Sequence, residues 1–372
     1  MKKILFLIHD LGQGGAEKVL VNLVNNMDRS KFDISVTVLF GGGVNEQFLA
    51  SDIHFHAVFP KEVPGNSKLM KLLTPKQLHR LCVKEHYDIE VSYLEGPSAR
   101  VISGCQDPDT KLVSWIHSTM TSIEDAAGSF RSIQEAQRCY NRFDQVVCVS
   151  QWVKQSFMNA FPEQSKVSVL YNTIESNQIL AQSQLPVSGN LFRDDEIKLI
   201  AVGSMKPVKA FDRLIRIHDR LRREGYPVHT YFLGVGTDLD KLKDQADDLK
   251  QSDTITFLGY ETNPYKYVAK ADLFVCCSLS EGFSTAVTEA LIGGTPVCTV
   301  EVSGMKEMLG ENNKWGVVTE NNEDALYQGI KRLLDSPDLL AHYKSQASLR
   351  GQNFRTEETV KDVEQMLIQL KE

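Results

Sequence analysis

The sequence predicts an α/β protein with two doubly wound domains, in which parallel strands alternate with helices. A chain of 372 residues is long enough for two domains with full cores. Short apolar runs typical of strands buried on both faces recur along it, separated by turns or helical patterns. A polar stretch without apolar periodicity interrupts this alternation at residues 175–196 and indicates a linker. We therefore expect a first domain at 1–172, a linker at 173–196, a second domain at 197–350 and a C-terminal segment at 351–372.

The composition excludes several classes of protein. Hydrophobic residues make up 42% and charged residues 24% of the chain, as in ordinary soluble globular proteins. The net charge of -7 argues against a nucleic-acid binder. The cysteines form no C-x-x-C pair and several lie in apolar runs, so we expect reduced core thiols, a reducing compartment and no zinc site. The opening M-K-K-I-L-F-L-I-H-D is too short an apolar run for a signal peptide or a transmembrane helix, and we expect a cytoplasmic protein.

A glycine-rich turn follows the first expected strand, at residues 4–8. The turn reads H-D-L-G-Q-G-G-A-E-K, and its glycines would let the backbone approach a phosphate at the start of a helix: Gly12, Gly14 and Gly15. A dinucleotide site is disfavoured, because Glu17 stands at its third glycine position and no acid follows the second expected strand, at 34–40. The alternative is that these glycines serve the geometry of the turn alone.

The segment 66–84 is rich in basic residues and contains no acid. Thr74 and Pro75 have the sequence of a helix N-cap and first helical position. Three cations then recur every four residues beside an apolar stripe: Lys76, Arg80 and Lys84. Such a face suits contact with an anionic membrane surface or a lipid diphosphate acceptor, and an ordinary solvated helix face is an equally good interpretation.

The segment K-L-V-S-W-I-H, at residues 111–117, is an expected strand that ends in a histidine. Ligands of α/β sheets bind at the carboxyl ends of the strands, so His117 is placed to reach one, although a histidine there is more often structural. Further strands expected at 144–150 and 167–170 complete the alternation of the first domain.

The second domain restarts the strand pattern at residues 197–202, which G-S-M-K-P-V-K-A follows. Two more strands that run into glycine-containing turns are expected at 229–236 and 255–260. After residue 317 the chain is acidic and helical, and its apolar positions at 360–370 have helical spacing.

The stretch from 271 to 300 combines a strand, a loop, a helix and a further strand. Ser284 or Thr285 can cap the helix. Glu281 in the loop and Glu289 about one turn into the helix break an otherwise apolar context. The free N–H groups of a helix N-terminus favour an anion such as a diphosphate, and the two carboxylates suit hydroxyl groups. This combination points to a nucleotide sugar, whereas two solvent-exposed glutamates are the simpler alternative.

These segments resemble the retaining glycosyltransferases of family 4. The resemblance rests on a glutamate, seven residues and a second glutamate around the E-G-F-S loop, and on G-G-A-E-K, W-I-H, Y-N-T-I and G-S-M-K-P-V-K in the same order. It covers about 4–345. It implies the GT-B fold, in which two Rossmann-like domains face each other across a cleft and the last helix crosses back onto the first domain. The acceptor would then bind mostly to the first domain and the nucleotide sugar mostly to the second.

The resemblance also implies roles for individual residues. Glu281 would contact the donor sugar, Glu289 the ribose hydroxyls, and His117 the donor sugar or its phosphate. The other residues of the implied donor site are Gly14 and Gly15 over the donor phosphate, Gly259 and Tyr260 beside the nucleobase, and Gly282, Phe283 and Ser284 in the loop before the helix.

One part of the sequence departs from the family pattern. Lys209 matches a lysine that clamps the donor diphosphate. Ser204 stands where the family usually has an arginine, and Ala210 where it has a glycine. A serine hydroxyl donates one uncharged hydrogen bond where arginine offers a charged fork, so the clamp lacks one cation unless Lys206 compensates.

The implied activity is a retaining transfer of a hexose-type sugar from a nucleotide-diphosphate sugar, with UDP favoured. The implied acceptor is a glycan or lipid-linked acceptor in bacterial capsule, exopolysaccharide or lipopolysaccharide synthesis, at the inner face of the plasma membrane. We expect no metal cofactor, because D-P-D at 107–109 has the surroundings of an ordinary surface loop. Two alternatives stay open: a nucleotide-sugar epimerase of the same fold, and a non-catalytic partner subunit, which Ser204 motivates.

Overall fold

The computed structural model describes residues 1–12, 14–62, 65–187, 189, 191–281, 283–302 and 304–370. The chain divides into two compact units. The first comprises Met1–Ile174 and Thr356–Glu372, and the second comprises Glu175–Arg355.

The first unit is built on a parallel sheet. In the described residues its seven strands have the order β3-β2-β1-β4-β5-β6-β7. Ile4 on β1 pairs in register with Ile34 on β2 and with Ile89 on β4, so β1 lies in the middle of the order and is buried almost throughout. The strands are β1 (Lys2–Ile8), β2 (Phe32–Phe40), β3 (His54–Phe59), β4 (Ile89–Ser92), β5 (Lys111–Ile116), β6 (Gln145–Cys148) and β7 (Val167–Val169).

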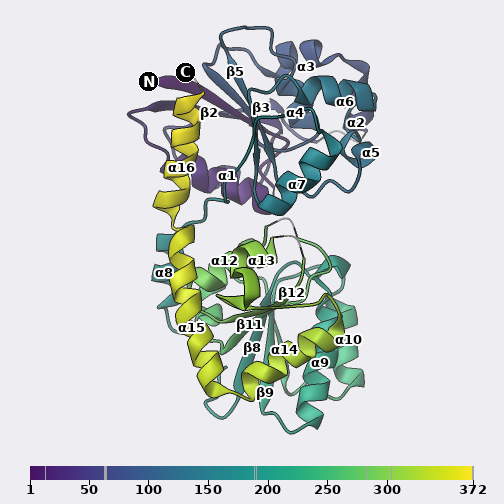
Figure 1. Ribbon diagram of the computed structural model, residues 1–372, viewed down its shortest axis with the longest axis vertical. Helices are drawn as coiled ribbons and strands as arrows, with labels where there is room; N and C mark the ends of the chain where they lie inside the picture. The colour runs from purple at the N-terminus through teal and green to yellow at the C-terminus, as the bar shows by residue number, and fades with distance from the viewer. Residues whose placement is uncertain are drawn as a thin grey trace. The chain divides into compact units, whose positions relative to one another are not determined.

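Helices connect these strands, as Figure 1 shows. Several begin at the side-chain caps that their sequences provide, and Thr74 forms a capping box with Gln77 at the start of α3. The helices are α1 (Gly15–Asn26), α2 (Asn66–Leu72), α3 (Pro75–Cys82), α4 (Pro97–Ile102), α5 (Ile123–Ala126), α6 (Ile133–Tyr140) and α7 (Gln151–Ala160), with the short 3-10 turn η1 (Glu46–Phe48).

The last helix, α16 (Thr356–Gln369), belongs to the first unit although 181 residues of the second unit precede it in the chain, from Glu175 to Arg355. It runs beside α1 (Figure 1). Glu364 accepts a hydrogen bond from the Asp28 backbone N–H at 2.6 Å and pairs with Lys31 at 3.0 Å. Buried Val363 and Leu367 complete this attachment.

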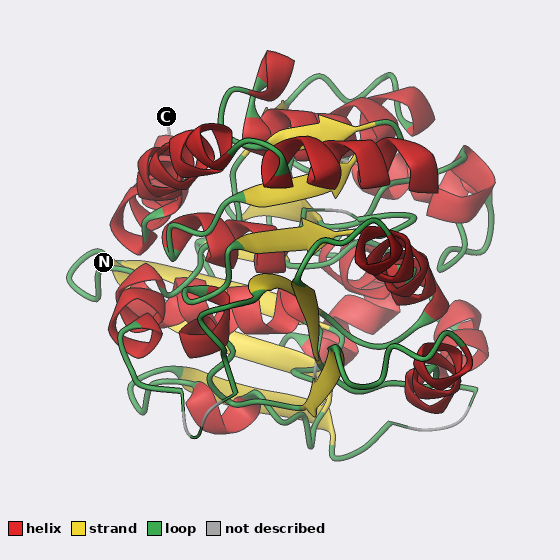
Figure 2. Ribbon diagram, turned by 90° about the horizontal axis from the view of Figure 1, so that it is seen from below, coloured by secondary structure: helices red, strands yellow, loops and turns green. Residues whose placement is uncertain are grey.

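The second unit has a parallel sheet of six strands in its described residues, with the order β10-β9-β8-β11-β12-β13. Helices lie on both sides of the strands (Figure 2). The strands are β8 (Ile197–Val202), β9 (Val228–Leu233), β10 (Ile255–Gly259), β11 (Leu273–Cys276), β12 (Val297–Val300) and β13 (Val317–Thr319). The helices are α8 (Ser176–Ser183), α9 (Phe211–Arg223), α10 (Leu239–Asp248), α11 (Tyr265–Val268), α12 (Thr285–Ile292), α13 (Met305–Leu309), α14 (Glu323–Leu334) and α15 (Pro337–Gly351), with 3-10 turns η2 (Pro207–Lys209), η3 (Glu311–Asn313) and η4 (Gln352–Phe354).

Each sheet reverses its strand order once, which creates a topological switch point. In the first unit the reversal lies between β1 and β4, and in the second between β8 and β11. Ligands of open α/β sheets bind beyond the carboxyl ends of the strands at such points. The two Rossmann-like domains predicted from the sequence are therefore present, each with a place for a ligand.

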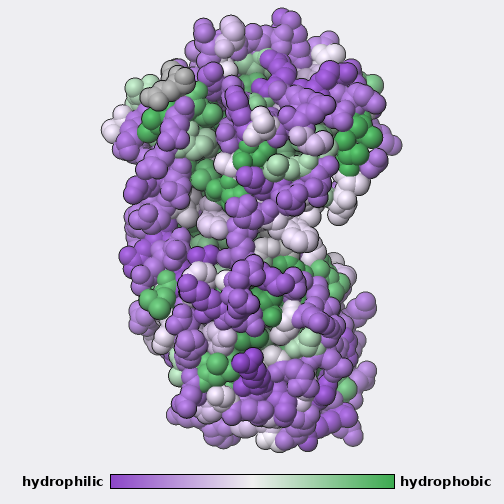
Figure 3. All heavy atoms as spheres, viewed as in Figure 1, coloured by the Kyte–Doolittle hydropathy of each residue, from purple (hydrophilic) through white to green (hydrophobic). Residues whose placement is uncertain are grey.

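Some elements differ from the sequence-based expectation. The strands β3 and β4 were not expected, and helix α8 lies inside the segment that was expected to be a linker. Helix α3 ends at Cys82, so Lys84 lies beyond the helix and donates a hydrogen bond back to the Arg80 carbonyl. Lys76, Arg80 and Lys84 are all exposed, and the face of the molecule seen in Figure 3 is mostly hydrophilic. None of the described helices is both long and apolar enough to cross a membrane.

Candidate functional site

Two loops meet at the switch point of the second unit. One follows β8 and carries η2, and the other follows β11 and leads to α12. The Leu279 N–H donates to the Val208 carbonyl at 2.8 Å, which holds the two loops together. Residues far apart in the sequence thus share one site.

Lys209 and Glu281 form the charged centre of this site. The Lys209 ammonium lies 2.6 Å from Glu281 Oε1, and Ser278 Oγ donates to the same oxygen at 2.6 Å. The side chain of Lys209 is 21% exposed and that of Glu281 11%, so solvent screens this pair less than an ordinary surface pair. The two residues that the sequence assigned separately are therefore direct partners.

Glycines allow the strand ends around this pair to pack closely. Gly234 has a φ of +132°, and a side chain there would collide with the backbone of Gly203. A side chain at Gly236 would likewise meet the Met205 backbone. The Lys209 side chain passes over Gly203, where an added Cβ would lie 3.4 Å from its Cε. The loop after β8 is thus fixed by close backbone contacts.

Ala210 adopts the left-handed conformation, with φ 49° and ψ 40°. Glycine reaches this region without strain, and an alanine does not. The glycine usual at this position in family 4 is therefore explained by the turn from η2 into α9. Ser204 is exposed in the same loop, and Lys206 is exposed two residues further on.

Helix α12 begins beside Glu281. Ser284 is its N-cap, and the serine Oγ accepts a hydrogen bond from the Val287 N–H at 3.5 Å. Glu289 is partly buried on this helix, and Tyr265 OH donates to Glu289 Oε1 at 3.3 Å. Phe283 is buried and packs edge to face against the Phe354 ring, with the ring centroids 6.0 Å apart.

The residues expected beside a nucleobase lie at the end of β10. Gly259 has a φ of +71°, and its carbonyl accepts a hydrogen bond from the Gly234 N–H at 2.7 Å. Tyr260 is 75% exposed. Its ring is therefore available to a planar ligand. Gly282, the remaining residue predicted in this group, lies outside the described residues.

In the first unit, the glycine turn leads into α1. Gly14 is the N-cap of this helix and Gly15 its first residue, and both are exposed. The Glu17 carboxylate folds back over Gly14 and fills the space that a side chain there would need. Burial raises the pKa of Glu17. An acidic group therefore lies close to the helix end that the sequence assigned to a phosphate.

His117 follows β5 directly. Its backbone N–H donates to Glu95 Oε2 at 2.9 Å, and its ring lies against Tyr93 with centroids 5.0 Å apart. Its Nε2 atom is buried and has no hydrogen-bond partner within the described part of the chain. Burial lowers the pKa of His117 to about 3, so the ring is neutral near pH 7. An unpartnered polar nitrogen of this kind suits a ligand contact.

The D-P-D motif forms the surface loop that the sequence predicted. Asp107 accepts a hydrogen bond from the Asp109 backbone N–H at 3.0 Å and pairs with His86 at 2.8 Å. The side chains of both partners are exposed to solvent. The Asp107 carboxylate is therefore engaged in local contacts.

Two families of known proteins match the chain, one for each unit. Residues 13–178 match the family described as Glycosyltransferase Family 4, and residues 187–350 match Glycosyl transferases group 1. The chain is a glycosyltransferase of family 4 type. It is a glycosyltransferase of GT-B fold, as the family resemblance of the sequence implied.

Relatives of this glycosyltransferase are found among proteins of bacterial glycan synthesis. One, from Campylobacter jejuni, is N-acetylgalactosamine-N,N'-diacetylbacillosaminyl-diphospho-undecaprenol 4-alpha-N-acetylgalactosaminyltransferase. It is 26% identical over 99% of this chain and 100% of its own length. Another is a lipopolysaccharide core biosynthesis glycosyltransferase of Rhizobium meliloti, which is 20% identical over 86% of each chain.

Solved structures of the same fold include the Anabaena protein HepE in complex with UDP and glucose. Its TM-score is 0.76 at 20% identity, with 99% of this chain and 100% of that chain covered. Sucrose-phosphate synthase from Thermosynechococcus elongatus has a TM-score of 0.78 at 16% identity, with 100% and 99% covered.

Two residues of the glycosyltransferase site were not predicted from the sequence. Ser278 and Tyr265 orient the two glutamates, Ser278 through Glu281 and Tyr265 through Glu289. A serine three residues before Glu281 was visible in the sequence as a weak signal. Tyr265 offered none, because it lies 24 residues from its partner and reaches it only through the packing of α11 against α12.

Proposed function

We propose that this glycosyltransferase moves a hexose-type sugar from a UDP-sugar, with retention of configuration, to a glycan or lipid-linked acceptor of a bacterial surface polysaccharide. The observation that carries the proposal is the pairing of Lys209 with Glu281 at the switch point beside the N-terminus of α12. A cation, a carboxylate and free helix N–H groups together suit a ligand with a diphosphate and sugar hydroxyls.

Each group has a distinct task in this proposal. The Lys209 ammonium and the α12 N-terminus stabilise the charge that develops on the leaving diphosphate, a contribution of about 3 kcal/mol for each well-placed donor. Glu281 accepts hydrogen bonds from the sugar hydroxyls, and Glu289 accepts them from the ribose. Ser278 and Tyr265 hold these carboxylates in place.

The first unit supplies further groups to the proposal. His117 presents its unpartnered Nε2 to the sugar or its phosphate as a neutral hydrogen-bonding group, because burial lowers its pKa to about 3. Gly14 and Gly15 offer backbone N–H groups at the start of α1. Glu17 moves away from Gly14 when an anion binds, since two negative groups repel each other there.

Several lines support the choice of donor and acceptor. The structural neighbour HepE is known in complexes with UDP, glucose and UDP-glucose, which favours UDP as the leaving nucleotide. The name of the Campylobacter relative specifies a diphospho-undecaprenol acceptor, which favours a lipid-linked acceptor. The exposed cations Lys76, Arg80 and Lys84 are suited to an anionic membrane surface that carries such a lipid.

The test is a panel of UDP-, GDP- and ADP-sugars, scored by thermal shift and by slow release of nucleotide diphosphate without acceptor. We expect a shift and release with one UDP-sugar in the native protein, and loss of both in Glu289→Gln. The matched control Glu358→Gln, at an exposed position of α16, should behave as the native protein. No response to any donor would contradict the proposal, and an epimerised sugar nucleotide as product would identify an epimerase.

We further propose that the transfer needs no metal ion, because Lys209 and the α12 N-terminus supply the positive charge that a divalent cation supplies elsewhere. Activity should therefore persist in EDTA. Loss of activity in EDTA that Mg²⁺ or Mn²⁺ restores would contradict this.

A further inference from the structure

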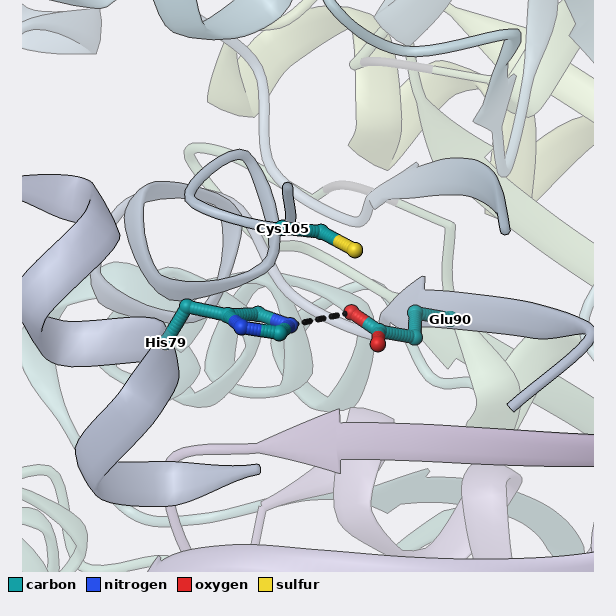
Figure 4. A group of neighbouring side chains, drawn as sticks. All are labelled: His79, Glu90 and Cys105. Atoms are coloured by element: carbon teal, nitrogen blue, oxygen red, sulfur yellow. Dashed lines mark hydrogen bonds and ion pairs between the residues drawn. The ribbon is translucent and has the colours of Figure 1, made fainter. Parts of the chain in front are cut away.

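Three potential metal ligands converge in the first unit, and none of them was assigned a role above. His79 comes from α3, Glu90 from β4, and Cys105 from the loop after α4. Their ligand atoms all lie within 4.8 Å of one another, and no other group of three or more such side chains converges as closely in the described residues. Figure 4 shows the His79 ring and the Glu90 carboxylate pointing toward each other, with the Cys105 sulfur beside them.

We propose that His79, Glu90 and Cys105 bind one Zn²⁺ ion. Imidazole, carboxylate and thiolate are the three side-chain types that zinc prefers, and three protein ligands leave a fourth position for water. The site differs from the expectation drawn from cysteine spacing, because that spacing detects only ligands that lie close in the sequence.

The geometry needs small movements to hold the ion. Tetrahedral zinc with bonds of about 2.0 to 2.3 Å places its ligand atoms roughly 3.3 to 3.6 Å apart. His79 Nε2 lies 2.8 Å from Glu90 Oε2, so these two atoms must move slightly apart. The other separations are all within 4.8 Å and must close by no more than about 1 Å. Side-chain rotation in α3 and the Cys105 loop can provide both.

The backbone holds the three segments in place before any ion binds. A side chain at Gly104 would collide with the Pro75 carbonyl and crowd the His79 Cβ, so glycine lets α3 lie directly on the loop. Arg142 Nη2 donates to the Cys105 carbonyl at 2.6 Å and fixes the other side of that loop. Glu90 lies on β4, and the pairing of this strand with β1 and β5 on its two sides fixes the position of the Glu90 backbone.

Charge also favours a cation at this place. Glu90 is 2% exposed, and a buried carboxylate needs a positive partner. A protonated His79 is such a partner and gives a simple ion pair at 2.8 Å. In that alternative the buried Cys105 thiol only interacts with His79, whereas Zn²⁺ with one carboxylate, one thiolate and a neutral imidazole is a fully neutral site that uses all three side chains as ligands.

Solvent reaches the cluster through a cavity of about 260 Å³. His79, Glu90 and Cys105 lie in its wall, together with His86 and Asp107. The cavity gives an ion a path of entry and room for a bound water. A filled site would link α3, β4 and the loop after α4, so zinc should stabilise the first unit.

The experiment measures zinc bound to the untagged, full-length protein after metal removal, by competition with a chromogenic chelator. We expect one Zn²⁺ per chain and a higher melting temperature with zinc. Cys105→Ser and His79→Gln should each abolish stoichiometric binding and the zinc-dependent thermal shift. Cys82→Ser is the matched control, because it removes another buried cysteine of the same unit that lies outside the cluster.

Two outcomes would overturn the proposal. Less than one zinc per chain at saturation in the native protein would show that the cluster is only an ion pair. Binding that survives both Cys105→Ser and His79→Gln would place the ion elsewhere. Circular dichroism of each variant, recorded without zinc, separates loss of the site from loss of the fold. Because Mg²⁺ prefers oxygen ligands, activity that Mg²⁺ restores after EDTA treatment would not be due to this site.

Discussion

Lys209 and Glu281 neutralise each other at 2.6 Å, which bears on how a donor would bind. A diphosphate that approaches the ammonium must compete with a carboxylate already beside it. Glu281 keeps a second partner, Ser278, and would be free to turn toward hydroxyl groups once the phosphate has taken the lysine. Because Ser204 stands in the place of an arginine, we expect Lys209 to carry more of the charge of a bound diphosphate than its family counterparts, unless Lys206 compensates.

Ala210 is strained at the end of the loop that carries Lys209. A left-handed conformation costs an alanine about 1 to 2 kcal/mol, and a glycine at position 210 would remove this strain. The greater conformational freedom of glycine in the unfolded chain offsets roughly 0.4 to 1 kcal/mol of that gain. Ala210→Gly should therefore raise the free energy of unfolding by about 0.5 to 1 kcal/mol in urea titration. Ala341→Gly, at an exposed helical position of α15, should lower it by about 1 kcal/mol. Equal destabilisation by both substitutions would show that Ala210 is unstrained.

The elements that the sequence predicted best are those with uninterrupted apolar residues. The strand expected at 197–202 has the bounds of β8, and the helix expected after Glu281 is capped by Ser284, one of the two caps that the sequence offered. β4 was missed because Glu90 interrupts its apolar pattern, and the side chains that meet this buried carboxylate, His79 and Cys105, come together only in the folded chain.

The sequence predicted the residues of the candidate site but not the contacts between them. Lys209 and Glu281 were both singled out, but they are 72 residues apart and meet only because β8 and β11 are neighbours at the sheet reversal. Strand order depends on the packing of the whole unit, so it cannot be predicted from local sequence patterns. Tyr265 was missed for the same reason.

Helix α9 is tied to two neighbouring segments by a buried histidine. The ring nitrogens of His218 lie 2.8 Å from Thr230 Oγ1 and 2.9 Å from Thr254 Oγ1, and burial lowers the pKa of His218 to about 3. The unfolded chain takes up a proton below about pH 6.5 and the folded chain does not, so this stabilisation is present above pH 6.5 and is lost as the pH falls toward 3.

The change that tests this is His218→Gln, which cannot titrate. Between pH 7.5 and 5.0, the unfolding free energy of the native protein should fall by about 2 kcal/mol more than that of the variant. His342→Gln, at the surface of α15, should leave the native pH dependence unchanged. The same fall in native protein and His218→Gln would show that His218 does not contribute.

At the scale of the whole molecule, the first unit is made of two segments that the second unit separates in the sequence. The first unit includes α16, which follows the whole of the second unit in the sequence. Its attachment combines an ion pair from Glu364 to Lys31 with burial of Val363 and Leu367. Helix α16 is therefore part of the unit that the first half of the sequence forms.

Removal of residues 356–372 should destabilise the first unit selectively. The truncation exposes the apolar surface that Val363 and Leu367 cover, at about 1.5 to 3 kcal/mol for each large buried side chain, and leaves Lys31 without Glu364. Hydrogen exchange followed by mass spectrometry should show faster exchange in β1 and β2, with β8 and β9 unchanged. Should the truncated chain fail to fold, Glu364→Gln offers a milder form of the same test, because it removes the charge and keeps the helix. Uniform acceleration across both units would contradict separate stability, and no acceleration would show that α16 contributes nothing to the unit it joins.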